Sequence, residues 1–161
     1  MTKPRHNAPQ VRKAMARFFS EYDARKAEAV GEVLVQTLER GQRISPMKTG
    51  RFAASIHMTT DDKPQTRYPR GDRWNRGRSF AQMRENKQAA LRIIESLKGR
   101  RAMSIRFFSN APHAHLVEKG WTLTRGPNAG QRIPGNNVFR KMQTWMQSRL
   151  KRVGMEMRKN A

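Results

Sequence analysis

The sequence predicts an α+β domain in which a small mixed or antiparallel sheet is packed by a long N-terminal helix, a middle helix and a C-terminal helix. Two observations lead to this prediction. Three long segments repeat apolar residues at spacings of three and four, as amphipathic helices do. Two short runs between them, residues 55–60 and 103–109, combine β-branched, aromatic and other apolar residues in the manner of strands.

The first helix is predicted over residues 9–40, with Gly41 as its C-terminal stop and Gly31 as a candidate bend. We expect its apolar stripe to pack on the core. The middle helix is predicted over residues 79–98, with Ser79 as N-cap, and the last over residues 136–159. The stripes consist of Val11, Met15, Phe18, Phe19, Tyr22, Val30, Val33, Leu34 and Leu38 in the first helix, Phe80, Met83, Ala90, Leu91, Ile94 and Leu97 in the second, and Val138, Met142, Trp145, Met146, Leu150, Val153 and Met157 in the third.

The length, charge and cysteine content of the chain limit its number of domains, its class of partner and its cellular compartment. We expect its 161 residues to form one domain, 1–161, with residues 1–8 as a flexible basic arm. Thirty-four Lys and Arg against 12 Asp and Glu give a net charge of +22, which attracts polyanions such as nucleic acids, unless it serves solubility alone. Cysteine is absent, which excludes disulfides and thiolate metal sites. We recognise no signal peptide or membrane-spanning run, so we expect a protein of the cytoplasm or of a particle assembled there, with no membrane partner.

Two long loops are predicted, over residues 61–78 and 121–135, because both stretches are rich in glycine and proline. The first interleaves arginines with Tyr68 and Trp74, a composition that suits phosphate contacts and base stacking. A solvated excursion whose charge only prevents aggregation is an equally open interpretation. The candidate nucleic-acid or partner contacts are Arg67, Arg70, Arg73, Arg76, Arg78, Arg100 and Arg101.

The most specific local pattern lies at residues 106–120. A strand leads to Asn110, a candidate helix N-cap, and a short helix is predicted over residues 113–119. Gly120 then ends that helix. We expect Gly120, and Gly50 further upstream, to hold backbone conformations that a Cβ would strain.

This pattern resembles the neck and tail-completion proteins of tailed bacteriophages, the group that includes the minor tail protein Z family. The family's Asn, Pro-Tyr-Ala-like turn, apolar-Glu pair and Gly are matched within residues 110–120, and its Ser-Pro-Val-Asp-Thr-Gly-Arg segment within residues 45–56. An Ala-Pro-x-Gly element is matched weakly near residue 134. The chain departs from the family at His113, at Lys48 and in a longer spacing before Pro134. The motif residues are Thr49, Gly50, Arg51, Ser55, Asn110, Pro112, His113, Glu118, Gly120, Pro134 and Gly135.

The resemblance implies a structural virion protein at the phage neck or the head-proximal end of the tail, present in the host cytoplasm during assembly. Copies would join into a ring, expected to contain six, that completes the tail and meets the head-completion or connector proteins and the tail tube or tail terminator. Genomic DNA would pass through the lumen and be contacted without sequence preference. The resemblance also implies a fuller sheet, with extra strands near residues 63–68 or 131–138. It gives Glu118 a fold-defining bond to backbone or to an arginine. The alternative from another class is a free basic nucleic-acid-binding protein, such as a DNA-packaging or ribosome-associated factor.

Enzyme chemistry finds little support in the sequence, and we expect no catalytic residues, metal or cofactor. His115 and Glu118 stand three residues apart on a predicted helix, but His113 falls on another face, so a packed or solvated histidine pair is favoured over a metal site. No nucleophile motif or phosphate-binding glycine loop is recognisable. Arg51 is expected to pair with a carboxylate, with a phosphate contact as the alternative.

Overall fold

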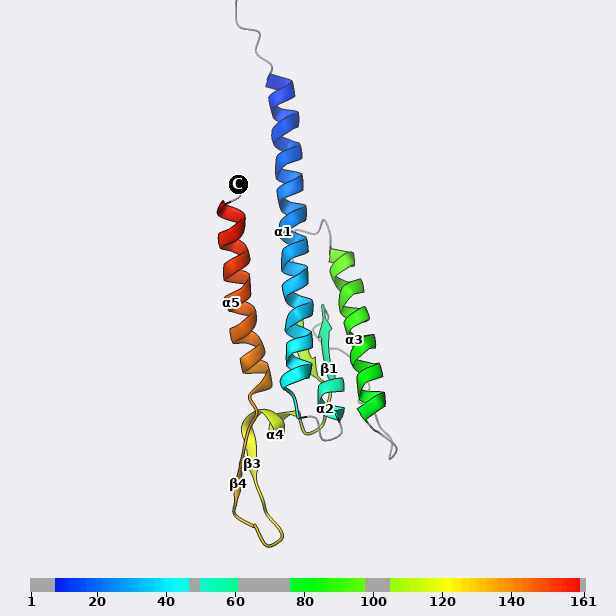
Figure 1. Cartoon of the computed structure of the whole chain (residues 1–161), viewed down its shortest axis with the longest axis vertical. Coiled ribbons are helices and arrows are strands. Elements are labelled where there is room, and N and C mark those ends of the chain that lie inside the picture. Colours follow the sequence, from blue (N-terminus) through cyan, green and yellow to red (C-terminus); the bar gives the residue numbers. More distant parts are fainter. Residues whose placement is uncertain (1–7, 47–49, 61–75, 98–104, 160–161) are drawn as a thin grey trace, which may run out of the picture.

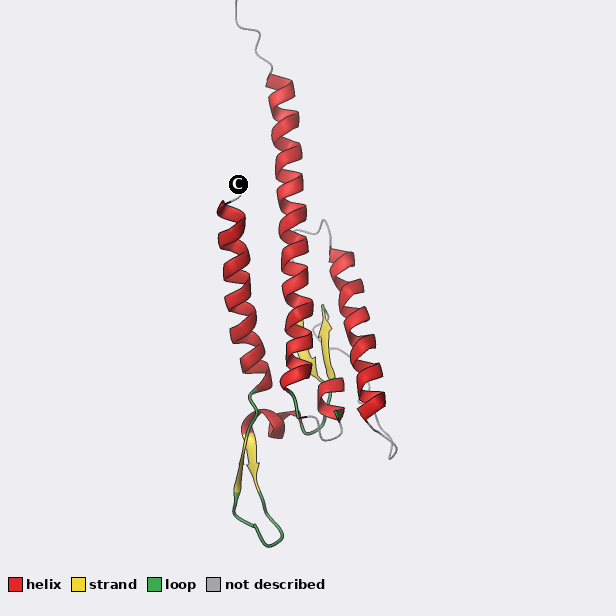
Figure 2. Cartoon of the chain, viewed as in Figure 1, coloured by secondary structure: helices red, strands yellow, loops and turns green. Residues whose placement is uncertain are grey.

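A computed structural model of the chain describes residues 8–46, 50–60, 76–97 and 105–159 (Figures 1 and 2). These residues form a mostly helical α+β fold, which confirms the predicted class. In chain order the elements are α1 (Ala8–Ile44), α2 (Arg51–Ala54), β1 (Ile56–Thr59), α3 (Arg76–Leu97), β2 (Arg106–Ser109), α4 (Ala114–Lys119), β3 (Gly120–Thr122), β4 (Arg132–Pro134) and α5 (Val138–Lys159).

Helix α1 lies between α5 and α3, and all three run roughly along the long axis of the molecule (Figure 1). Strands β1 and β2 pair antiparallel, with Ile56 opposite Ser109 and Thr59 opposite Arg106. Both α1 and α3 pack against β1. The antiparallel pair β3–β4 forms a second sheet, which extends away from the helices at the end opposite the N-terminus of α1 (Figure 2).

The buried core lies where the C-terminal half of α1 meets the other elements. Its members come from both ends of the chain, so the core depends on contacts between distant segments. The buried cluster consists of Leu34, Leu38, Phe52, Ile56, Met58, Ala90, Ala111, Val117, Val138 and Met142.

Two glycines predicted to interrupt α1 instead allow other helices to approach it. The helix continues through Gly41 to Ile44, so the predicted stop at Gly41 is wrong. A Cβ on Gly41 would collide with the Met142 sulfur, and one on Gly31 would lie 2.6 Å from Ile94 Cγ2. At both positions the missing side chain makes room for a neighbouring helix. Helix α1 runs unbroken from Ala8 to Ile44, so Gly31 does not end it (Figure 1).

The N-terminal part of α1 extends beyond α3 and α5 (Figure 1). At 37 residues α1 is about 55 Å long, whereas α3 and α5 have 22 residues each. Met15 is 53% exposed, and residues 23–28 are exposed as well. The expectation that the whole apolar stripe packs on the core is therefore wrong at Met15, because the helix is longer than the elements that could cover it.

Helix α3 begins at Arg76, so Ser79 is buried inside the helix instead of capping it. Its inward face also differs from the predicted stripe, since Phe80 is 51% exposed and Leu91 41% exposed. The buried Asn86 explains this orientation: its Nδ2 donates to the carbonyl oxygens of Ala54 (2.8 Å) and Ile56 (3.0 Å). Buried backbone carbonyls require such partners, and an apolar pattern cannot reveal them.

The predicted loop over residues 121–135 is a β-hairpin, built from β3, β4 and their connection. Strand β4 falls within one of the two stretches where extra strands were expected, residues 131–138, but it pairs with β3 in a separate sheet. Among the described residues the β1–β2 sheet therefore has two strands and is not the fuller sheet that was expected. The other stretch, residues 63–68, lies outside the described residues, as does most of the predicted loop 61–78. Residues 76–78 of that loop are the first turn of α3. Residues 1–7 of the predicted arm are also outside the described residues, and Ala8 is helical.

His57 lies half-buried on β1, with its ring stacked on Phe108 at 5.4 Å between centroids. Burial lowers the pKa of His57 below its ordinary value of 6.5, and a hydrogen bond with Asn86 opposes that shift only in part. Below pH 6.5 the unfolded chain takes up a proton that the folded protein resists, so the free energy of unfolding falls as pH drops toward the folded-state pKa.

We therefore predict that His57→Gln reduces the loss of thermal stability between about pH 7 and pH 5.5. The measurement is the melting temperature of both proteins across this range, because carboxylates that titrate in both proteins cancel in the difference. His115→Gln is the matched control, since the His115 side chain is exposed. Parallel melting curves for wild type and His57→Gln would show that His57 is not the responsible group.

Candidate functional site

The first two motif segments meet at the β1–β2 sheet. Gly50 has φ 68°, in the left-handed region, and directly precedes α2. Ser55 follows α2, and its hydroxyl shares a 2.6 Å hydrogen bond with that of Ser109, at the end of β2. The Asn110 amide then donates to the Ser55 carbonyl at 3.4 Å. Residues 50–56 and 106–110 are thus bonded to each other. The positive φ of Gly50 confirms the expectation that a Cβ would strain its backbone. Thr49 lies outside the described residues.

Glu118 connects the second motif segment to α5. Both of its carboxylate oxygens accept from the backbone amide of Phe139, at 3.1 and 3.2 Å. Phe139 is the second residue of α5, where amides lack partners within the helix. The Asn136 amide also donates to the Val117 carbonyl at 2.7 Å. The bond to backbone that was expected for Glu118 is therefore confirmed.

Gly120 and Gly135 cross at the base of the hairpin. Gly120 has φ 80° and ψ 177°, a conformation essentially restricted to glycine. A Cβ on Gly120 would lie 2.6 Å from the Gly135 nitrogen, and a Cβ on Gly135 would lie 2.6 Å from the Gly120 nitrogen. Pro134 pairs with Gly120 in the sheet register. The third motif element therefore packs directly on the second, and we call this crossing the Gly120–Gly135 junction.

The turn before α4 differs from its prediction. The N-cap is His113, without a side-chain hydrogen bond, so Asn110 does not cap the helix. The chain makes another turn after Asn110, around Ala111 and the exposed Pro112, before α4 starts. The His113 ring instead lies 6.2 Å from that of Phe52, between α4 and α2. Within the described residues, no group of three His, Cys, Asp or Glu is placed to hold a metal ion.

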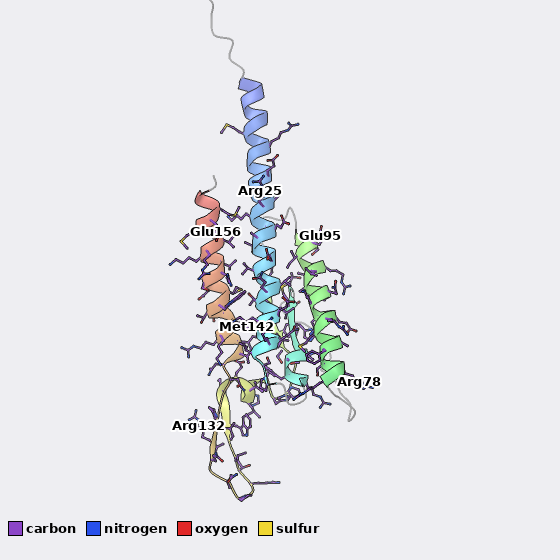
Figure 3. The ribbon with its side chains drawn as sticks, viewed as in Figure 1. Arg25, Arg78, Glu95, Arg132, Met142 and Glu156 are labelled. Atoms are coloured by element: carbon purple, nitrogen blue, oxygen red, sulfur yellow. The ribbon has the colours of Figure 1, made fainter. Side chains whose placement is uncertain are left out.

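The predicted arginine cluster is only partly within the described residues. Arg67, Arg70, Arg73, Arg100 and Arg101 lie outside them. Arg76 and Arg78 are exposed in the first turn of α3, at the end of that helix nearer the hairpin (Figure 3). Arg51 is half-buried at the start of α2. Whether the cluster forms one surface therefore stays a prediction.

The structure brings together a basic groove that the sequence analysis did not identify. We call it the Trp145 groove; it has a volume of about 570 Å³ and is lined by Arg40, Asn137, Arg140, Lys141, Thr144, Trp145 and Ser148. The sequence assigned Trp145 to an apolar stripe. Lys141, Trp145 and Arg149 do follow one another at intervals of four on a single helix face, which is a local signal. Arg40 comes from α1, so no spacing along the chain could have placed it there.

No family model, curated protein or solved structure matches the chain. The resemblance to phage neck proteins therefore depends on the motif residues themselves. Across the parts of the chain that the structure describes, no helix combines the length and apolar character needed to cross a membrane.

We predict that Gly120→Ala lowers the free energy of unfolding by about 2–4 kcal/mol, because it adds backbone strain and a collision with the backbone at the Gly120–Gly135 junction. Gly154→Ala is the control, since a Cβ there meets no atom within 4 Å and alanine favours the helix. Denaturant unfolding measures both. A Gly120→Ala protein as stable as wild type would mean that the junction is not closely packed.

Proposed function

We propose that the protein is a structural component of a tailed-phage virion, placed at the neck or the head-proximal end of the tail. Copies form a ring, expected to contain six, which completes the tail and joins it to the head-completion or connector proteins on one side and the tail tube or tail terminator on the other. The genome passes through its lumen. The protein assembles in the host cytoplasm and acts without catalysis, metal or cofactor.

The observation that carries the proposal is that residues of the three motif segments bond to or pack on one another. The bond from the Asn110 amide to the Ser55 carbonyl joins the first segment to the second, and Glu118 joins the second to α5. The Gly120–Gly135 junction joins the second segment to the third. A chance likeness in sequence gives no reason for three separated segments to contact one another in space, whereas a shared fold does.

The shape of the chain also supports a role in assembly. The hairpin and the N-terminal part of α1 extend in opposite directions from the core (Figure 1). On the hairpin Trp121 is 38% exposed, and on α1 Met15 is 53% exposed. Large apolar side chains on extended elements are available for contacts with neighbouring subunits. The hairpin suits such contacts because the Gly120–Gly135 junction and Glu118 fix its base.

The second candidate is a free basic nucleic-acid-binding protein, and the Trp145 groove is the observation that favours it. The net charge of +22 is compatible with both functions. A free nucleic-acid-binding protein would not require the contacts between the motif segments or the extended hairpin, so we place this function second.

The test is a reconstruction of intact particles of a phage whose genome encodes this chain. We predict several copies in a closed ring at the head–tail junction, with each hairpin contacting a neighbouring subunit. One asymmetric copy, or absence from the particle, would contradict the ring. The isolated protein can remain monomeric if the ring forms only on its partners, so its state in solution does not decide the question.

A shortened hairpin tests the assembly contact directly. Replacing residues 124–130 by Asn-Gly keeps the bond from the Leu123 amide to the Gln131 carbonyl (2.9 Å) and supplies a tight turn. We expect this variant to melt like wild type but to be lost from particles. The control is Arg84→Gln with Arg92→Gln, which alters exposed side chains on α3 and leaves incorporation intact. Normal incorporation of the shortened chain would exclude the hairpin as a subunit contact.

A further inference from the structure

The Trp145 groove combines cations from two helices in one open depression. Arg40 comes from α1, and Arg140 and Lys141 come from the first turn of α5. The Arg149 guanidinium lies next to the groove, 5.3 Å from the centre of the Trp145 ring. All four cationic side chains are exposed, so their charged ends are accessible to a ligand.

Nearby carboxylates do not neutralise this charge. No acidic side chain is among the described residues that line the groove. Glu39, the neighbour of Arg40 in the chain, is bonded to Lys87 of α3 at 2.7 Å. Glu118 is bonded to the Phe139 amide and keeps its negative charge, which is one charge against four cations, and Glu156 lies toward the other end of α5 (Figure 3). The groove therefore keeps a positive potential of its own.

Trp145 holds two of the guanidinium groups in place. The Arg40 guanidinium carbon lies 5.7 Å from the ring centre, and that of Arg149 lies 5.3 Å away. Cation–π contacts at these distances restrict two long side chains before any ligand arrives. A restricted guanidinium loses less entropy on binding, and its planar array of donors matches phosphate oxygens.

The other polar side chains of the groove are hydrogen-bonded within the protein, and the Asn137 Nδ2 donates to the Gly135 carbonyl at 3.4 Å. The Thr144 hydroxyl donates to the Arg140 carbonyl (3.1 Å), and the Ser148 hydroxyl donates to the Trp145 carbonyl (2.9 Å). Both protons are thus engaged within α5, which leaves the cationic groups as the main donors to a ligand. Such contacts fix position on a phosphate backbone but carry no sequence information.

We propose that the Trp145 groove binds the phosphate backbone of duplex DNA without sequence preference, with Arg40, Arg140, Lys141 and Arg149 as the phosphate contacts and Trp145 as the residue that positions Arg40 and Arg149. From residue 140 to residue 149, α5 rises about 13 Å. One DNA strand carries a phosphate about every 3.4 Å along its axis, so roughly four phosphates pass over this length.

Other occupants fit the groove less well than DNA does. A second copy of a chain with net charge +22 would bring repulsion. A membrane surface calls for apolar side chains beside the cations, yet the large apolar residues that are exposed in the described structure (Met15, Phe80, Leu91, Trp121 and Met155) do not line the groove. The proposal does not depend on a place in the virion, since the isolated chain is expected to bind DNA.

The experiment measures the binding of the full chain to a short fluorescent DNA duplex of arbitrary sequence at several salt concentrations. For Arg140→Gln with Lys141→Gln we expect the log–log salt slope to fall by about two units, because each lost phosphate contact removes roughly 0.9. Arg84→Gln with Arg92→Gln removes the same charge from exposed positions on α3 and is expected to change the slope much less. Equal changes in the two variants would overturn the proposal, because only the overall charge would then matter.

A charge-neutral variant separates the groove from general electrostatics. Trp145→Leu is expected to weaken DNA binding about two- to fivefold, which corresponds to the loss of an exposed cation–π contact. Trp121→Leu, at an exposed tryptophan of the hairpin, should leave the affinity unchanged. Melting temperatures confirm that both variants fold. If folded Trp145→Leu bound DNA with the wild-type affinity, Trp145 would not be the residue that positions Arg40 and Arg149.

Binding of the protein to polyglutamate, measured beside its binding to DNA, tests whether the natural ligand of the groove is an acidic protein segment. The proposal predicts that the Arg140 and Lys141 double variant loses DNA affinity at low salt. If that variant instead bound DNA with the wild-type slope and lost its binding to polyglutamate, the groove would be a site for an acidic protein segment, and the DNA proposal would be wrong.

Discussion

The close approach of α1 and α5 determines how the rest of the molecule is arranged. Met142 of α5 is 2% exposed and packs at Gly41, where α1 has no side chain. In Figure 3, Met142 lies between the two helices. Arg40 is the neighbour of Gly41, and Trp145 lies one turn beyond Met142, so the contact that buries the methionine also forms the groove. A side chain at position 41 would separate the helices and move Arg40 away from Trp145.

Polar side chains help to complete a core that is short of apolar residues. Only 36% of the residues are hydrophobic, and much of α1 lies outside the core. Asn86 satisfies two carbonyls at the beginning of β1, and Glu118 satisfies an amide at the beginning of α5. Each of these bonds joins segments that are far apart in the chain. Since an unpaired buried polar group is costly, these bonds specify one arrangement among the ways in which a small apolar core could pack.

The same arrangement separates two kinds of surface. The hairpin and the N-terminal part of α1 extend away from the core and offer apolar side chains to neighbours, while the groove between α1 and α5 offers positive charge. In the proposed ring, the extended elements would contact other subunits and the grooves would face the DNA. A free nucleic-acid-binding protein would use the groove but would have no use for the hairpin. The two functions thus differ in which surface they require.

The sequence by itself determined the fold class, the three long helices, the two strands of the β1–β2 sheet and the special backbone of Gly50 and Gly120. These features follow from periodicity and from glycine's freedom at positive φ, which are properties of a few consecutive residues. The sequence alone did not determine that Gly41 lies inside a helix, that Asn86 faces inward or that residues 121–135 form a hairpin. Nor did it reveal the Trp145 groove. Tertiary structure decided these, because each depends on residues far away in the chain: Met142 beside Gly41, the carbonyls of Ala54 and Ile56 beside Asn86, and Arg40 beside Trp145.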